Sequence, residues 1–267
     1  MTDRAMNIAA TGMRAQEKNV DTSANNLANS NTTGFKKSVA QFTDLGYQTA
    51  KSPGDGSPEG LQFGLGTDVL ANSINFTPGE SISSEGNPLS LQIQDNNGSA
   101  FFVINLPNGE QAYTRDGRFT LNKEGVIVTL EGNVVEPQTE IQANLKDNIM
   151  IDSNGNIKIK TIGEEDDAEP QIIGQIALAT FVNKHGLEQS GGGLFKATGS
   201  SGDTILGVAG EGDFSNVSVK QFYLESSNSN SLNDITNLIK SQRAYGMNSK
   251  VIQTAERMGE DLARMKG

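Results

Sequence analysis

Residues 5–29 read AMNIAATGMRAQEKNVDTSANNLAN, a stretch with one Gly and no Pro. Its apolar residues recur at intervals of three and four, which is the spacing of one face of an α-helix. Glu17 interrupts that face once, and its apolar members are Met6, Ala10, Met13, Val20, Ala24 and Leu27. The pattern predicts a helix from Asp3 to about Asn29.

The other end of the chain repeats this spacing. Two runs with a change of phase between them predict a second helix from Leu232 to Met265: Leu232, Ile235 and Ile239, then Val251, Ala255, Met258, Leu262 and Met265. At ~1.5 Å per residue the two helices are about 40 and 50 Å long. Because each apolar stripe is narrow, we expect the helices to pair antiparallel, as in a coiled coil, and to bring the termini together. Two interpretations stay open for the apolar residues that this pairing does not cover. Either they contact other copies of the chain, or the two helices form an ordinary stalk in a monomer.

The middle of the chain, residues 62–224, has the pattern of short β-strands. Apolar, β-branched runs such as residues 101–104, 126–130 and 157–159 are separated by turn signals. Four of these signals are expected to supply the positive φ of tight hairpin turns: Asn97-Gly98, Asn108-Gly109, Asp116-Gly117 and Asn154-Gly155. The sequence therefore predicts an antiparallel β domain inserted between two terminal helices.

The predicted fold class is α+β with a discontinuous helical domain. Residues 1–35 and 228–267 form the helical, coiled-coil-like assembly domain in this interpretation. Residues 36–66, which include a stretch rich in Pro, Gly and Ser, form an extended connector. Residues 67–227 form the β-rich outer domain.

Composition excludes several classes of function. The chain has 267 residues, 35% of them hydrophobic, and a formal net charge of −11, which disfavours nucleic-acid binding and anionic membrane surfaces. It has no Cys, so thiol nucleophiles and zinc–thiolate sites are excluded. The sequence contains no pattern typical of a cleaved signal peptide and no apolar stretch long enough for a membrane span, so we expect no direct membrane insertion.

Motifs for catalysis or cofactor binding are weak. His185, the single His, lies in a sequence typical of a turn. The Gly triplet at residues 191–193 is not followed by the Lys-Ser or Lys-Thr of a phosphate loop. Asp152 begins a stretch similar to a calcium loop, but Gly163 stands where its bidentate acid would be, so a hairpin turn is expected. The acidic run at residues 164–167 is typical of a solvated loop. We therefore predict no enzymatic activity, no cofactor and no metal.

Three motifs resemble those of one known family. The chain is similar to the bacterial flagellar rod and hook proteins, the axial proteins of the flagellum. The resemblance rests on residues 24–29 and 32–36 near the first helix, on residues 101–104, 107–109 and 113–119 in the β region, and on residues 225–230, 238–245 and 248–252 near the second helix. These motifs occur in the family's order and cover the chain nearly end to end. Residues 93–100 and 227–230 depart from the family's usual sequence.

The resemblance and the residue types together indicate candidate assembly residues. Asn side chains weaken a helix end unless their amides find partners, so the Asn-rich motif is either a frayed helix end or a set of amides that bond to a neighbouring chain. Near the first helix the candidates are Asn25, Asn26, Leu27, Asn29, Thr32, Gly34, Phe35 and Lys36. In the connector, Pro53 and Pro58 are expected to be parts of a brace between subunits. In the second helix the candidates are Gln242, Arg243, Tyr245, Asn248 and Lys250. The β-domain motif residues are Tyr113, Thr114, Arg115, Gly117 and Phe119. By helical spacing, Tyr245 should pack against the partner helix and Arg243 should point outward.

The family resemblance implies a structural subunit that self-assembles into a rigid helical tube and transmits motor torque. It implies a homopolymer in the flagellar basal body that meets proximal rod proteins, the hook protein and the surrounding rings, with export by the flagellar type III apparatus. The length of the chain favours a rod subunit over a hook protein. Two alternatives remain open at this stage: another axial subunit, and a β-domain binding module with a helical stalk.

Overall fold

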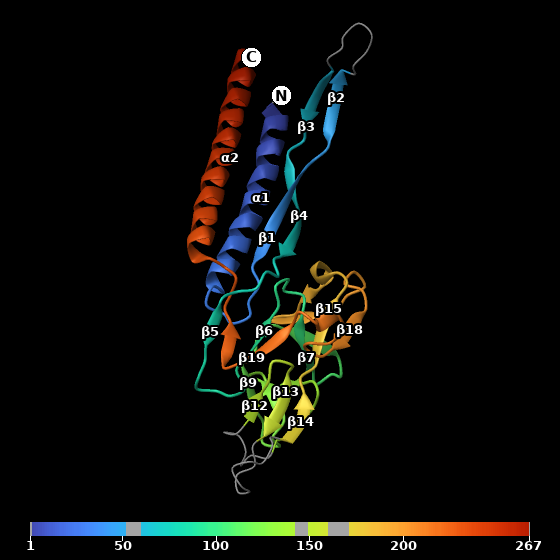
Figure 1. Ribbon diagram of the computed structural model, residues 1–267. Coiled ribbons are helices and arrows are strands. Elements are labelled where there is room, and N and C mark those ends of the chain that lie inside the picture. Colours follow the sequence, from blue (N-terminus) through green and yellow to red (C-terminus); the bar gives the residue numbers. More distant parts are fainter. Residues whose placement is uncertain (1, 52–59, 142–148, 160–170, 267) are drawn as a thin grey trace. The chain divides into compact units, whose positions relative to one another are not determined.

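The computed structural model describes residues 2–51, 60–141, 149–159 and 171–266. The chain divides into two compact units, which are coloured along the sequence in Figure 1. The first unit, which we call the helical unit, comprises residues 1–28, 38–75 and 230–267. The second, which we call the β unit, comprises residues 29–37 and 76–229.

The helical unit contains both predicted helices, α1 (Thr2–Ala28) and α2 (Ser231–Lys266). They run antiparallel side by side, with the two termini at the same end (Figure 1). The Nδ2 atom of Asn19 donates to Oγ of Ser241 at 2.7 Å. Seven residues earlier in α1, Gly12 approaches so closely that an added Cβ would lie 2.7 Å from Nδ2 of Asn248, seven residues later in α2. The expected antiparallel pairing is therefore observed, with a fixed register.

The buried positions of the two helices differ, except at Ala255, from the apolar stripes that the sequence indicated. The buried positions of α1 are small or polar, namely Ala9, Ala15, Thr22, Ser23 and Asn26. In α2 they are Asp234, Ser241 and Ala255, whereas eight larger apolar residues stay exposed: Leu232, Ile235, Ile239, Met247, Val251, Met258, Leu262 and Met265. Where the two helices are seen to come close, at Gly12 with Asn248 and at Asn19 with Ser241, the side chains are small or polar.

Four strands complete the helical unit: β1 (Ser38–Asp44), β2 (Tyr47–Lys51), β3 (Leu61–Gly64) and β4 (Thr67–Ile74). β1 pairs antiparallel with β4, with a bulge between Gln41 and Phe42, and this ribbon packs on α1. β2 pairs antiparallel with β3. In Figure 1, α1 lies between α2 and the β1–β4 ribbon. The stretch predicted as a connector, residues 36–66, thus contains three of these strands.

The β unit is built from short strands. They are β5 (Ser81–Ser83), β6 (Leu91–Gln94), β7 (Phe101–Asn105), β8 (Gln111–Thr114), β9 (Phe119–Leu121), β10 (Ile127–Thr129), β11 (Val134–Val135), β12 (Ile149–Ile151), β13 (Asn156–Ile159), β14 (Gln171–Gln175), β15 (Leu178–Phe181), β16 (Glu188–Gln189), β17 (Leu194–Lys196), β18 (Thr204–Gly207), β19 (Ser218–Gln221) and β20 (Tyr223–Glu225). The described part of this unit also contains the 3-10 turns Lys184–Gly186 and Gly212–Phe214.

The largest sheet of the β unit has the order β16-β17-β8-β7-β11-β10-β9, and β15 joins β7 to β18. Every pairing that the structure describes is antiparallel, as the sequence predicted. β7 lies at the centre, and its residues Phe101, Phe102, Val103 and Ile104 are fully buried. Smaller pairings join β12, β13 and β14, β6 with β19, and β5 with β20.

The expected turns are only partly confirmed. Asn108-Gly109 closes the β7–β8 hairpin and Asn154-Gly155 closes the β12–β13 hairpin, both with positive φ at Gly. Asp116-Gly117 is different, because Gly117 is not among the residues with positive φ and the two strands beside it, β8 and β9, do not pair. Gly is needed there for a close approach, since an added Cβ would lie 1.6 Å from the carbonyl oxygen of Leu91.

Candidate functional site

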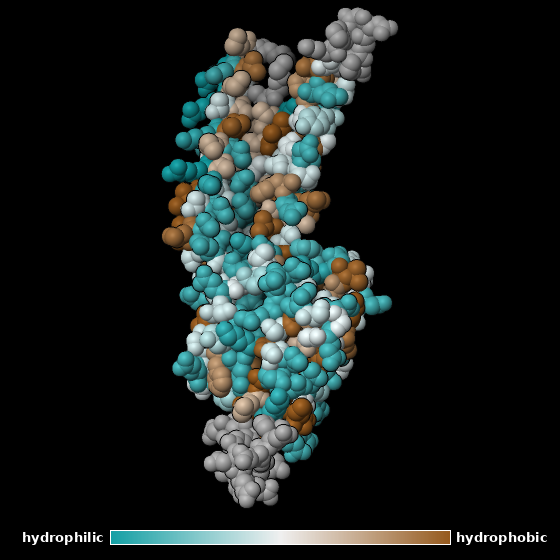
Figure 2. Space-filling model, viewed as in Figure 1, coloured by the Kyte–Doolittle hydropathy of each residue, from teal (hydrophilic) through white to brown (hydrophobic). Residues whose placement is uncertain are grey.

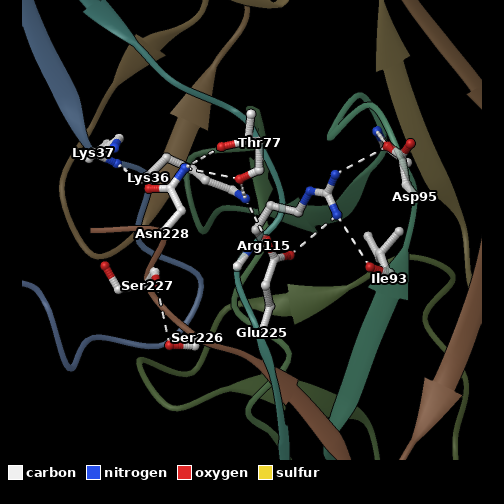
Figure 3. Close-up of polar contacts among 12 residues, drawn as sticks. Lys36, Lys37, Thr77, Ile93, Asp95, Arg115, Glu225, Ser226, Ser227 and Asn228 are labelled. Carbon is white, nitrogen blue, oxygen red and sulfur yellow. Dashed lines mark hydrogen bonds and ion pairs between the residues drawn. The ribbon is translucent and has the colours of Figure 1, made fainter. Parts of the chain in front are cut away.

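Charged residues from three separate motifs meet inside the β unit (Figure 3). Lys36 follows α1, Arg115 follows β8, and Glu225 ends β20. Nζ of Lys36 forms an ion pair with Oε1 of Glu225, and Nη1 of Arg115 lies 3.3 Å from Oε2 of the same carboxylate. Nη2 of Arg115 lies 3.2 Å from Oδ2 of Asp95, just after β6. We call these four residues the ion cluster.

The ion cluster is buried, and its charges are matched by hydrogen bonds. The side chains of Lys36 and Arg115 are 0% exposed and that of Glu225 is 1% exposed. Lys36 also donates to the carbonyl oxygen of Thr77 at 2.9 Å, and Oε1 of Glu225 accepts from the backbone N–H of Gly79 at 2.9 Å. A buried ion pair adds little net stability, but removal of one member leaves an unpaired buried charge at high cost. The ion cluster therefore fixes one geometry of the segments that carry it.

Electrostatics differ among the members of the cluster. Burial lowers the pKa of Lys36 to about 8, although the carboxylate of Glu225 favours the charged form. Burial of Asp95 opposes its ionisation, but the N–H groups of Ala100 and Asn97, together with Arg115, hold the pKa of this carboxyl below its ordinary value. Burial thus disfavours the charge of Lys36, whereas hydrogen bonds and Arg115 favour that of Asp95.

Arg115 connects the ion cluster to the aromatic core of the β unit. Its guanidinium carbon lies 5.6 Å from the centre of the Phe101 ring, and its Nη1 also donates to the carbonyl oxygen of Ile93 at 3.4 Å. The Phe101 ring contacts the rings of Phe76 and Phe195. Within the described part of the chain, Nε of Arg115 has no hydrogen-bond partner. The planar guanidinium thus holds a carboxylate on each side and a ring against its face, which Lys cannot do.

Gly34 allows the segment after α1 to reach this cluster. Its φ is +69°, and an added Cβ would lie 2.6 Å from the backbone nitrogen of Asp116. The N–H of Gly34 donates to the carbonyl oxygen of Glu225 at 2.8 Å. Both the left-handed backbone and the close approach require glycine.

Asn228 fastens the same segment a second time. Its Oδ1 accepts from the backbone N–H of Lys37 at 2.8 Å, and its Nδ2 donates to the carbonyl oxygen of Thr77 at 2.9 Å (Figure 3). The N–H of Asn228 donates to the carbonyl oxygen of Phe35 at 3.3 Å. The stretches that follow α1 and precede α2 are therefore joined side by side within the β unit.

The Asn-rich motif makes bonds within this chain. Nδ2 of Asn26 donates to the carbonyl oxygen of Ser38 at 2.7 Å, and Oδ1 accepts from the N–H of Ser38 at 2.9 Å. Asn26 is buried and links the end of α1 to the start of β1. The expectation that its amide is aimed at a neighbouring chain is therefore corrected, because both ends of the amide bind this chain. Asn29 accepts from the hydroxyl of Thr32 at 3.1 Å.

The β-domain motif residues have structural roles close to the ion cluster. The ring of Tyr113 packs edge-on against Phe181 with centroids 4.7 Å apart, and its hydroxyl lies 2.8 Å from that of Thr204. The hydroxyl of Thr114 donates to the carbonyl oxygen of Gly193 at 2.9 Å. Phe119 packs edge-on against the buried ring of Phe102.

The candidate residues of α2 are mostly exposed. Gln242, Arg243 and Lys250 are exposed, and Asn248 lies beside Gly12. Tyr245 is 41% exposed, so the expectation that it is buried between the helices is wrong. The close approach of α1 and α2 leaves no space for a ring between them. Pro53 and Pro58 lie outside the described residues.

Sequence reasoning missed two members of the ion cluster as site residues, Asp95 and Glu225. The contacts joining them to Lys36 and Arg115 span between 20 and 189 positions of sequence. The local signal for Glu225 was its place at the start of the motif at residues 225–230, which the sequence analysis quoted without naming Glu225 as a site residue.

The described residues contain no group of three or more His, Cys, Asp or Glu residues that could hold a metal ion. No helix in the described ranges is both long and apolar enough to cross a membrane. His185 lies in the turn Lys184–Gly186, as the sequence predicted.

Comparison with known proteins places these features in one class. Three family models match in order: "Flagella basal body rod protein" at residues 6–36, "Flagellar hook protein FlgE/F/G D1 domain" at residues 97–159, and "Flagellar basal body rod FlgEFG protein C-terminal" at residues 220–265. Lys36, Arg115 and Glu225 each fall in a different one of these segments. The class is that of the flagellar rod and hook proteins.

Similarity over the whole chain distinguishes rod proteins from hook proteins within this class. The chain is 42% identical to a flagellar basal-body rod protein FlgG of Caulobacter vibrioides, with 98% of this chain and 99% of that protein covered. It is 40% identical to the protein of the same name from Agrobacterium fabrum, with 98% of each covered, and 39% identical to that of Borreliella burgdorferi, with 96% of each covered. This chain belongs to the family of flagellar basal-body rod proteins.

Proposed function

We propose that this chain is a structural subunit of the distal rod of the flagellar basal body, where copies assemble into a straight, rigid tube that transmits motor torque to the hook. The observation that carries the proposal is the full-length similarity to basal-body rod proteins, in which all three motif segments are retained. Stiffness depends on a large contact area and on fixed internal joints, and it needs no active site.

The ion cluster supports this proposal from within one subunit. It joins the segment after α1 to the segment before α2 through buried charges, so the two chain crossings cannot slide past each other without breaking ion pairs. The Asn228 side chain fastens the same two segments. We propose that this joint keeps the β unit rigid under load.

The helical unit supplies the assembly surfaces in this proposal. Eight large apolar residues of α2 are exposed. Exposed apolar surface of this extent is typical of a contact surface, and contact with other copies would bury it. The segment around Pro53 and Pro58 is proposed as a brace between subunits. The expected partners are further copies, the proximal rod proteins, the hook protein and the surrounding rings, and the expected route of export is the flagellar type III apparatus.

Antibody labelling of isolated hook–basal bodies tests the function. An antibody against this chain should label the rod between the ring assembly and the hook. Labelling confined to the curved hook would favour a hook subunit, and a basal body without label would remove the proposal. Sedimentation of the purified chain provides a second test. A rod subunit should polymerise as its concentration rises, whereas a chain that stays monomeric at high concentration would behave as a free binding module.

A further inference from the structure

Most side chains of the β2–β3 hairpin are exposed. We call this hairpin, residues 47–51 and 61–64, the arm; it lies beside the N-terminal half of α1 in Figure 1. Tyr47 is 61% and Leu61 is 52% exposed, and Figure 2 shows hydrophilic and hydrophobic side chains intermixed over this part of the unit. A hairpin with so little buried surface depends on a few specific contacts for its position.

A glycine in each strand separates the arm from the β1–β4 ribbon. The N–H of Leu45 donates to the carbonyl oxygen of Gly66 at 2.9 Å, and the N–H of Leu65 donates to that of Gly46 at 3.2 Å. Gly66 has a φ of +114°, and an added Cβ at Gly46 would meet no atom within 4 Å. Because glycine leaves the backbone free in both strands at this level, the hairpin can bend here. We call these four residues the arm hinge.

One face of α1 holds the arm hinge. The N–H of Thr67 donates to the hydroxyl oxygen of Thr11 at 3.4 Å. An added Cβ at Gly66 would lie 2.1 Å from that oxygen and 3.5 Å from the Cα of Ile8, so the hinge lies directly on the helix. A contact at the hinge alone fixes where the arm begins, but it leaves the arm free to turn about that point.

Arg4 contacts the arm beyond the hinge. Its Nη2 donates to Oε1 of Gln48 at 3.3 Å, and its guanidinium carbon lies 4.4 Å from the centre of the Phe63 ring, which is the geometry of a cation–π contact. Gln48 and Phe63 pair across the two strands, so they share one side of the arm. Arg4 stands seven residues before Thr11, on the same face of α1 and about 10 Å away along its axis. Two contacts on one helix face fix a direction.

The position of Arg4 in the first turn of α1 is unfavourable for the helix itself. The N-terminus of a helix carries partial positive charge, which repels a cation. Among the residues that the structure describes, Arg4 takes part in no ion pair that would offset this repulsion. Its contacts with Gln48 and Phe63 are what this cation adds to the fold.

We propose that Arg4 is the positioning residue of the arm and that, together with Thr11 at the hinge, it sets the direction of the arm along α1. Loss of the Arg4 side chain frees the arm without unfolding the chain. The direction of the arm matters for stiffness because the segment between its strands carries Pro53 and Pro58. That consequence rests on the proposed function, in which this segment braces neighbouring subunits, whereas the direction of the arm in one copy does not.

A distance measurement in the monomer tests the direction of the arm. The chain has no Cys, so spin labels can be attached at Asp21→Cys in α1 and Gln62→Cys in the arm, both exposed positions. Double electron–electron resonance should give a narrow distance distribution in the labelled chain and a broad one after Arg4→Ala. Arg14→Ala removes another exposed Arg of α1 and should leave the distribution narrow. An unchanged distribution with Arg4→Ala, or equal broadening with Arg14→Ala, overturns the proposal.

Hydrogen exchange measures the strength of the contact. Arg4→Ala should speed exchange of the β2–β3 amides about fivefold or more, because it removes a cation–π contact and a hydrogen bond. The same substitution should have a smaller effect in a Phe63→Ala background, since the ring contact is then already lost. Ala is a good helix former, so exchange in α1 should not change. Faster exchange throughout α1, or an effect of Arg4→Ala that Phe63→Ala leaves intact, overturns the proposal.

The stiffness of the polymer tests the consequence for the brace. Electron micrographs should show that tubes of the Arg4→Ala variant bend more than those of wild type, whereas Arg14→Ala tubes should be as straight as wild type. Straight Arg4→Ala tubes would show that the direction of the arm does not determine stiffness. A wild-type chain that never polymerises counts against the proposed function itself, and the two monomer measurements then decide the role of Arg4.

Discussion

Lys36 and Glu225, separated by 189 positions of sequence, form a buried ion pair inside the β unit. The pair joins the stretch that leaves the first helix to the stretch that leads into the second. Arg115 holds the other oxygen of the same carboxylate. One acidic side chain thus organises three segments, and its replacement should affect the whole unit.

Glu225→Gln should lower the free energy of unfolding by about 3–5 kcal/mol, because it leaves two buried cations without their shared carboxylate. Denaturant unfolding followed by fluorescence or circular dichroism measures the change. Lys196→Met is the control, since the pair Lys196–Glu110 lies at the surface and its loss should change little. A Glu225→Gln variant as stable as Lys196→Met would show that the ion cluster does not hold the fold.

The pKa of Lys36 predicts a pH dependence of stability. Its pKa is about 8 in the folded chain against an ordinary 10.5, so between these values the unfolded chain binds more protons. The contribution of Lys36 to the free energy of unfolding should therefore rise with pH from about 8 to 10.5, by at most about 3 kcal/mol. Below pH 8 its contribution should be constant.

The comparison of wild type with Lys36→Met isolates this effect, since other titrating groups cancel in the difference. As the pH rises from about 8 to 10.5, the free energy of unfolding of the wild type should increase relative to that of Lys36→Met. A constant difference from pH 7 to pH 11 would rule out a lowered pKa for Lys36.

Gly34→Ala should destabilise the β unit by more than Gly109→Ala. Both glycines have positive φ, but an added Cβ at Gly109 meets open space, whereas one at Gly34 would lie 2.6 Å from the nitrogen of Asp116. Backbone strain alone costs about 1–2 kcal/mol, and the clash at Gly34 adds to it. Thermal unfolding of the two variants gives the comparison, and equal losses would contradict the close approach.

Asn26→Ala should cost about 1–3 kcal/mol, because the N–H and C=O groups of Ser38 lose their partners. Asn7→Ala, at an exposed position in α1, should have no such cost, since Ala is the better helix former. Chemical denaturation of the isolated chain measures both. If Asn26→Ala loses assembly but no stability, the role of this residue lies between subunits after all.

Periodicity and turn chemistry predicted much of the fold. Two long helices, their antiparallel pairing and the strands around residues 101–105 follow from local spacing and from Asn-Gly turns. Which face of each helix contacts the other could not be predicted from this spacing. Spacing identifies an apolar stripe, whereas the printed contacts between the helices join Asn19 to Ser241 and bring Gly12 close to Asn248.

The candidate site was predicted in part. Lys36 and Arg115 stand in motifs that the sequence singled out, but their meeting point at Glu225 depends on how three distant segments cross. Such a crossing is a property of tertiary topology, and no local pattern encodes it. Gly34 was named only as a candidate assembly residue, and its close approach to Asp116 appears only in the folded chain.

Electron microscopy of the polymer formed by the purified chain tests the central claim most directly. A rod subunit should form straight, hollow tubes, with the helical unit on the inner side and the β unit outside. Curved or supercoiled tubes would indicate a hook subunit. A reconstruction with the β unit lining the channel, or a chain that stays monomeric at every concentration, would contradict the account.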